Sequence, residues 1–130
     1  MSSNADLFNA AKAAMANTYS PYSKFPVGAA IRSASGVIYA GCNIENASFP
    51  EGWCAETSAI AHMVTAGERE ISEILVMAEK ADRATPCGGC RQRIAEFAKG
   101  DTPVHLCDSQ GVVETLTIAE LLPASFDLEA

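Results

Sequence analysis

Three cysteines constrain the fold of this chain more strongly than any other residues. Cys54 lies in the segment Trp-Cys-Ala-Glu-Thr, and Cys87 and Cys90 lie in a later segment, Pro-Cys-Gly-Gly-Cys-Arg-Gln. Three thiolates beside one acid, Glu56, are the residues of a catalytic zinc site, in which three protein ligands leave one position open for water. We therefore expect the fold to bring the three cysteines together around one Zn²⁺, with Glu56 as the catalytic proton carrier.

A purely structural zinc site is the alternative interpretation of these cysteines. Such a site is usually closed by a fourth Cys or His, for which the candidates are His62, His105, Cys42 and Cys107. His62 lies about 12 Å along a helix from Cys54, too far to share an ion easily. We expect Cys42 to be a core residue, whereas His105 and Cys107 lie on a predicted strand whose position the sequence leaves open.

Both cysteine segments are predicted to begin helices, at residues 53–66 and 87–98. Residues three apart on a helix share a face, so Cys87 and Cys90 can reach the same ion. Helix N-termini carry partial positive charge and free N–H groups, which favour a thiolate over a thiol. The predicted helix starts therefore suit the predicted ligands.

The spacing of apolar residues and the positions of Gly and Pro predict four helices and five strands. We expect helices at 4–19, 53–66, 87–98 and 117–122, and strands at 27–33, 36–45, 71–78, 104–107 and 112–116. This order favours a three-layer α/β/α fold, in which helices flank one mixed five-stranded sheet. Because the chain has 130 residues and no linker or repeat, we expect residues 1–130 to form a single domain.

Composition narrows the possible partners. The formal net charge is −7, and nucleic-acid binding draws mainly on Lys and Arg contacts to phosphates, so we expect no nucleic-acid partner. No apolar run approaches the ~20 residues that span a bilayer, and the first residues lack the pattern of a secretory signal. An odd count of five cysteines fits metal binding better than disulfides. We expect a cytoplasmic protein with no membrane partner and an uncharged small substrate.

Further segments extend the pattern around the cysteines. They are Ser-Pro-Tyr-Ser-Lys-Phe-Pro-Val-Gly-Ala-Ala (20–30), Gly-Cys-Asn-Ile-Glu-Asn-Ala (41–47) and Glu-Leu-Leu-Pro-Ala-Ser-Phe (120–126). With them, the chain resembles the small, homotetrameric, zinc-dependent cytidine deaminases. The resemblance implies a cytidine-deaminase-like fold and an enzyme of pyrimidine salvage. That enzyme hydrolyses cytidine and 2′-deoxycytidine to uridine and 2′-deoxyuridine, with release of ammonia.

The resemblance also implies the catalytic roles. Cys54, Cys87 and Cys90 would bind the zinc, with one ion per subunit. Glu56 would deprotonate the zinc-bound water, protonate the base nitrogen N3 as hydroxide attacks C4, and finally protonate the departing ammonia. This is the general mechanism of the zinc deaminases, in which a glutamate that is not a ligand acts as acid and base.

The substrate-binding roles follow from the same resemblance. The backbone N–H of Ala55 would bind the pyrimidine carbonyl, and Phe25 would pack against the base. Asn43 and Glu45 would bind the ribose, because residues two apart on a strand share a face and offer a hydroxyl both acceptors and a donor. Phe126 would stack on the base in a neighbouring subunit, so that active sites are shared within a homotetramer.

Three residues depart from the family pattern. Thr57 follows the catalytic glutamate where arginine is common. Since Zn²⁺ with three thiolates carries a net charge of −1, a nearby cation should help. We expect Arg91, or a hydrogen bond from Thr57 to a thiolate, to compensate in part. Phe49 stands where tyrosine is common, and Trp53 is an unusually large residue before the first cysteine; both are expected to line the site.

Other functions remain possible from the residues alone. One is a related deaminase that acts on a cytosine-containing antibiotic such as blasticidin S. Another, from a different class, is a non-catalytic zinc-binding interaction module. A nucleic-acid editor is disfavoured by the net charge of −7 and by the absence of a basic stretch.

Overall fold

The five predicted strands form one mixed sheet. The strands are β1 (Val27–Ser33), β2 (Ile38–Cys42), β3 (Ile71–Ala78), β4 (Pro103–Cys107) and β5 (Val112–Thr117). In this computed structural model, which describes residues 4–128, the strand order is β2-β1-β3-β4-β5. β3 and β4 are parallel, and the other neighbouring pairs are antiparallel. The expectation of a mixed five-stranded sheet is confirmed.

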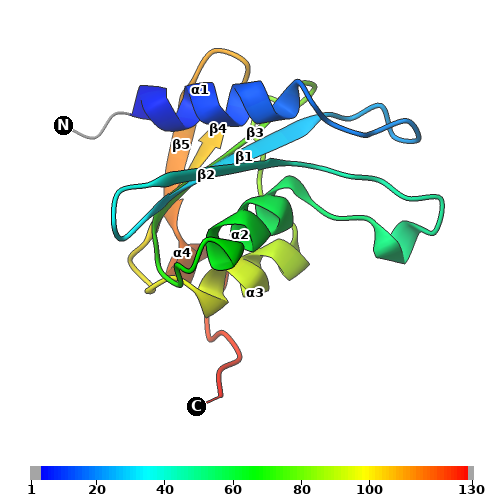
Figure 1. Cartoon of the computed structure of the whole chain (residues 1–130). Helices are drawn as coiled ribbons and strands as arrows, with labels where there is room; N and C mark the ends of the chain where they lie inside the picture. The colour runs from blue at the N-terminus through cyan, green and yellow to red at the C-terminus, as the bar shows by residue number, and fades with distance from the viewer. Residues whose placement is uncertain (1–3, 129–130) are drawn as a thin grey trace.

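Helices cover both faces of this sheet. They are α1 (Asn4–Met15), α2 (Ala55–Thr65), α3 (Gly88–Glu96) and α4 (Ile118–Leu121), and a short 3₁₀ turn, η1 (Phe49–Glu51), precedes α2. Figure 1 shows α1 on one face and the other three helices on the opposite face. The three-layer architecture is therefore as predicted. Within residues 4–128, no helix has the length and apolar character needed to cross a membrane.

The sheet separates two apolar cores, and β3 contributes to both. Ile74 and Val76 pack on the side of α2 and α3, whereas Leu75 and Met77 pack against α1. Because successive residues of a strand point to opposite faces, a strand covered on both sides needs a nearly continuous apolar run. This explains why residues 74–78 are all buried.

Several predicted elements are shorter in the structure, and two of them end three or four residues before the expected position. The first helix was expected to reach residue 19, but it ends at Met15 because a turn follows and Tyr19 forms a β-bridge with Ile44. The second strand was expected to reach residue 45, but β2 ends at Cys42 because Ile44 pairs with Trp53 instead of with β1. The segments 19–26 and 43–53 thus lie together at one end of the sheet (Figure 1).

Close contact between β2 and α2 depends on Gly41. A Cβ atom at this position would lie 2.4 Å from the backbone nitrogen of Ala59 and 2.8 Å from the carbonyl oxygen of Ala55. Only glycine lets the helix backbone approach the strand this closely. The position of the N-terminus of α2, which bears one cysteine segment, is fixed by this contact.

Candidate metal and catalytic site

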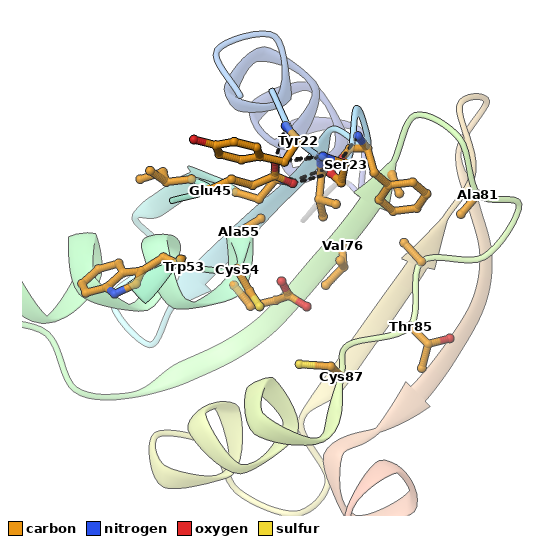
Figure 2. A pocket seen from close by; sticks show the side chains of 18 of the residues that line it. Tyr22, Ser23, Glu45, Trp53, Cys54, Ala55, Val76, Ala81, Thr85 and Cys87 are labelled. Carbon is orange, nitrogen blue, oxygen red and sulfur yellow. Dashed lines mark hydrogen bonds between the residues drawn. The ribbon is translucent and has the colours of Figure 1, made fainter. Parts of the chain in front are cut away.

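The three predicted ligands meet between the N-termini of two helices. Cys54 is the residue directly before α2, Cys87 is the residue directly before α3, and Cys90 lies in the first turn of α3. Neither Cys54 nor Cys87 uses its side chain to cap its helix, so both thiols are available to a ligand. Figure 2 shows Cys54 and Cys87 extending toward the same space from the two elements.

The thiol geometry fits one zinc ion. The three Sγ atoms all lie within 4.8 Å of one another. Tetrahedral zinc with Zn–S bonds of about 2.3 Å separates its sulfur ligands by roughly 3.8 Å. The three thiols therefore need only a small shift toward one another to coordinate the ion. His62 and His105 do not belong to this group: His62 Nδ1 lies 3.4 Å from the Ala40 carbonyl oxygen, and His105 contacts Glu73 and Thr115. Three thiols with no fourth ligand among residues 4–128 match an open zinc site.

The thiols are electrostatically coupled. A hydrogen bond from Cys90 lowers the pKa of Cys54, whereas that same bond and burial raise the pKa of Cys90. The two sulfurs thus lie within hydrogen-bond reach of each other, and a dication bound between them would hold both as thiolates.

Glu56 is a buried acid beside the thiols. It is the second residue of α2, its side chain is 4% exposed, and it lines the same pocket as Cys54 and Cys87. Burial raises the pKa of the carboxyl group, and a hydrogen bond from Cys90 and the charge of Arg93 offset this only in part. A raised pKa suits an acid that both accepts and donates a proton near neutral pH.

A pocket of about 670 Å³ opens above these groups. Four of the residues expected to bind substrate line it: Phe25, Asn43, Glu45 and Ala55. Phe126 does not. Its side chain is 72% exposed, and its carbonyl oxygen accepts a 3.5 Å hydrogen bond from Gln92. Within one chain, then, the structure gathers every predicted site residue except Phe126.

Asn43 and Glu45 hold the loop that carries Phe25. The Asn43 amide accepts a hydrogen bond from the Val27 N–H at 3.0 Å and donates one to the Phe25 carbonyl at 2.9 Å. Glu45 Oε1 accepts from the N–H groups of Tyr22 and Ser23, at 2.9 and 3.1 Å, and Oε2 accepts from the Ser23 hydroxyl. Figure 2 shows the bonds that join Glu45 to Tyr22 and Ser23.

The Glu45 carboxylate is an ionised acceptor. The hydrogen bond from the Ser23 hydroxyl, more than any other contact, lowers the pKa of Glu45. Each carboxylate oxygen has more than one lone pair, so Glu45 can accept a further hydrogen bond from a ligand in the pocket. Glu45 therefore both holds the loop through Tyr22 and Ser23 and offers an acceptor to the pocket.

Sequence reasoning missed the opposite wall of the pocket. Ala81, Arg83, Ala84 and Thr85, from the connection between β3 and α3, line it together with Val76 of β3. These residues follow the carboxyl end of a strand with one parallel neighbour, a common location for ligand pockets in α/β folds. Their position in the sequence, just before Pro86 and the predicted ligand Cys87, is the signal that could have identified them as pocket residues. Phe49 and Trp53 line the pocket as expected, with Trp53 extending away from Cys54 (Figure 2).

The contacts of Cys90 bear on the two expected sources of compensation. Thr57 Oγ1 lies 3.8 Å from Cys90 Sγ, as the hydrogen-bond alternative expects. Arg91 is not directed at the thiol: it donates to the carbonyl oxygens of Pro86 at 2.8 Å and Leu121 at 2.9 Å. Arg91 therefore makes no hydrogen bond to the thiol, because two backbone carbonyls bind its guanidinium group, and a role for its charge stays a prediction. The cation at Cys90 is instead Arg93, whose Nη1 donates to the sulfur at 3.8 Å.

Comparison with known proteins places this site in a family. The family model described as "Cytidine and deoxycytidylate deaminase zinc-binding region" matches residues 1–106, a range that includes both cysteine segments. The chain belongs to this deaminase family. A cytidine deaminase of Sporosarcina psychrophila is 46% identical over 118 residues, which cover 91% of this chain and 87% of that protein. One from Halalkalibacterium halodurans is 42% identical over 111 residues, covering 85% and 84%.

Solved structures of the family share the fold. The crystal structure of cytidine deaminase from Burkholderia pseudomallei matches with a TM-score of 0.91 at 39% identity, over 96% of this chain and 100% of that one. The predicted cytidine-deaminase-like fold is confirmed. Because the family's matched region is a zinc-binding one and the donor set is three clustered thiols, the cofactor is Zn²⁺.

Proposed function

We propose that this protein hydrolyses cytidine and 2′-deoxycytidine to uridine and 2′-deoxyuridine, with release of ammonia. The observation that carries the proposal is the buried Glu56 beside three clustered thiols at the base of a nucleoside-sized pocket. The names of its relatives support the substrate, since they are cytidine deaminases. The place of this reaction is pyrimidine salvage, which supplies uridine from cytidine.

Glu56 moves the protons in this reaction. Cys54, Cys87 and Cys90 would hold the metal, and Zn²⁺ bound there supplies the Lewis acidity that activates water. Water adds to C4 of the base, and the bond from C4 to the exocyclic nitrogen breaks. Glu56 accepts one proton from the water and donates it to ring nitrogen N3. It then accepts the proton of the new C4 hydroxyl group and passes it to the amino group, which departs as ammonia and leaves the C4 carbonyl of uridine.

The pocket walls would orient the nucleoside. Ala55, whose N–H lies in the first turn of α2, would donate to the pyrimidine carbonyl. Phe25 would pack against the base, and Asn43 and Glu45 would bind the ribose hydroxyl groups. Their pocket positions support these assignments, and their hydrogen bonds to the segment 22–27 would preorganise the sugar site before substrate arrives.

Glu45→Gln should raise KM for cytidine about tenfold and change kcat less. The amide replaces one carboxylate oxygen by an NH₂ group, so a ribose hydroxyl loses an acceptor, at a cost of about 1–2 kcal/mol. Ser23→Ala is the matched control, because it removes the hydroxyl that binds Glu45 yet keeps the carboxylate. Steady-state kinetics of both variants decide: an equal rise in KM for Ser23→Ala would mean that Glu45 acts only through the loop.

We also propose a homotetramer in which Phe126 of one subunit completes the pocket of another. Phe126 is exposed, and so are Tyr22, Phe49 and Trp53 at the pocket, which leaves apolar surface to be covered. Light scattering should give the mass of four 13.6 kDa chains, and Phe126→Ala should lower turnover without loss of zinc. A monomeric mass with full turnover would contradict the proposal.

The remaining proposals concern the whole chain. Residues 1–130 would form a single domain, and the protein would be cytoplasmic, without nucleic-acid or membrane partners. The five cysteines, all of them free, support a reducing compartment. The net charge of −7 argues against a polyanionic partner.

The test of the proposed function is a comparison of substrates. Loss of cytidine absorbance, followed alongside the same assay on blasticidin S, should show fast turnover of cytidine and little or none of the antibiotic. Turnover of the antibiotic alone would overturn the assignment. Zinc binding without turnover of either compound would instead indicate a non-catalytic module.

A further inference from the structure

One sulfur atom, Cys90 Sγ, is contacted from both helices of the site. Arg93, three residues further along α3, donates to it through Nη1 at 3.8 Å. Thr57, on α2, places its hydroxyl oxygen 3.8 Å from the same sulfur. Cys90 itself is fully buried, whereas Arg93 is an exposed residue whose guanidinium group reaches in to the sulfur. Residues three apart share a helix face, which is why Arg93 can reach back to Cys90.

The first turn of α3 leaves room for the Arg93 guanidinium group. A Cβ atom at Gly89 would lie 3.3 Å from Arg93 Nη1 and 3.9 Å from Cζ. The guanidinium group thus packs against Gly89 and reaches the sulfur of Cys90. Arg91 is bound to two backbone carbonyls, so Arg93 is the arginine of this helix that contacts a thiol.

The negative charge expected at the zinc site gives a physical reason for a cation at Cys90. Zn²⁺ with three thiolates has a net charge of −1, and the Glu56 carboxylate lies buried beside them. Negative charge removed from water is costly unless cations or donors face it. The N-termini of α2 and α3 supply partial positive charges, and Arg93 supplies a full one.

We propose that Arg93 is a positioning residue of the metal centre, whose guanidinium group, with the Thr57 hydroxyl, binds the Cys90 thiolate and offsets the charge of the zinc site. The proposal rests on the proposed assignment of the three thiolates as zinc ligands. It makes the strength of zinc binding depend on a side chain that touches neither the ion nor the substrate. Partners of this kind typically contribute 10- to 100-fold to metal affinity.

The test is zinc affinity, measured by competition with a chelating dye, in Arg93→Met and Lys99→Met. Both variants lose one positive charge, but Lys99 is an exposed residue that pairs with Glu70 at 3.7 Å. Arg93→Met should bind zinc about tenfold more weakly, Arg93→Lys should keep most of the affinity, and Lys99→Met should match the wild type. Equal affinities for Arg93→Met and the wild type, or an equal loss in Lys99→Met, would overturn the proposal.

Cobalt substitution separates a contact with the sulfur from a general structural effect. A thiolate that loses a hydrogen bond gives up its electrons more easily, so the sulfur-to-cobalt absorption band should move to longer wavelength in Arg93→Met. An unchanged band would show that Arg93 does not act through Cys90. Should Arg93→Met fail to fold, Arg93→Gln, which keeps a donor without the charge, takes its place in the affinity measurement, where loss of the charge should weaken zinc binding. Absence of zinc from the wild type would defeat the proposed function itself.

Discussion

Replacement of Glu56 by Gln should lower cytidine turnover by about 10²- to 10⁴-fold while leaving zinc binding unchanged. Glutamine keeps the size of the side chain but can neither accept nor return a proton, and proton transfer by a positioned group contributes about that much to a rate. The side chain is 4% exposed, so bulk water has little access to take its place. Single-turnover kinetics and metal analysis on the same preparation measure both quantities.

Glu51→Gln is the matched control for this variant. Glu51 is an exposed acid in η1, five residues before Glu56, and it does not line the pocket. Its variant should retain full turnover. A Glu56→Gln protein that keeps its rate to within tenfold would show that another group carries the proton.

Replacement of Cys90 by Ala should weaken zinc binding by roughly 10²- to 10⁴-fold. Zinc bound by a set of cysteine and histidine ligands is held by about 10–16 kcal/mol, so one of three ligands accounts for roughly 3–5 kcal/mol. Loss of Cys90 also removes the sulfur that Thr57 and Arg93 contact. Competition with a chelator of known affinity gives the dissociation constant directly.

Cys42→Ala provides the comparison for the cysteine variant. Cys42 is half-buried at the end of β2 and does not belong to the three-thiol group. We expect its variant to bind zinc as the wild type does. Unchanged zinc affinity in Cys90→Ala would remove this residue from the ligand set and leave a two-thiol site.

Sequence patterns predicted which strands form the sheet better than they predicted where α1 and β2 end. The bounds of β3, 71–78, were predicted at both ends, because a continuous apolar run before a polar loop is a local signal. The end of α1 was not, since it depends on a bridge between Tyr19 and Ile44 that no local pattern records. The same bridge region removes Asn43 and Glu45 from β2, although their role at the pocket does not require the strand.

The candidate site divides in the same way. Cys54, Glu56, Cys87 and Cys90 were identifiable because their chemistry and spacing are specific. Arg93 was not, because an exposed arginine on a polar helix face is ordinary in sequence and only the positions of Gly89 and Cys90 show where it reaches. Phe126 was named by resemblance, and its proposed place in the site depends on a second chain.

The central claim is that this chain joins a three-thiolate zinc site to one buried acid in order to deaminate cytidine. The most direct measurement is the ammonia released per cytidine consumed by the zinc-loaded protein, by the same protein stripped with a chelator, and after zinc is returned. The account predicts one ammonia and one uridine per cytidine, loss of activity on stripping, and its recovery with zinc. Turnover that persists without the metal, or a zinc-loaded protein that leaves cytidine unchanged, would contradict it.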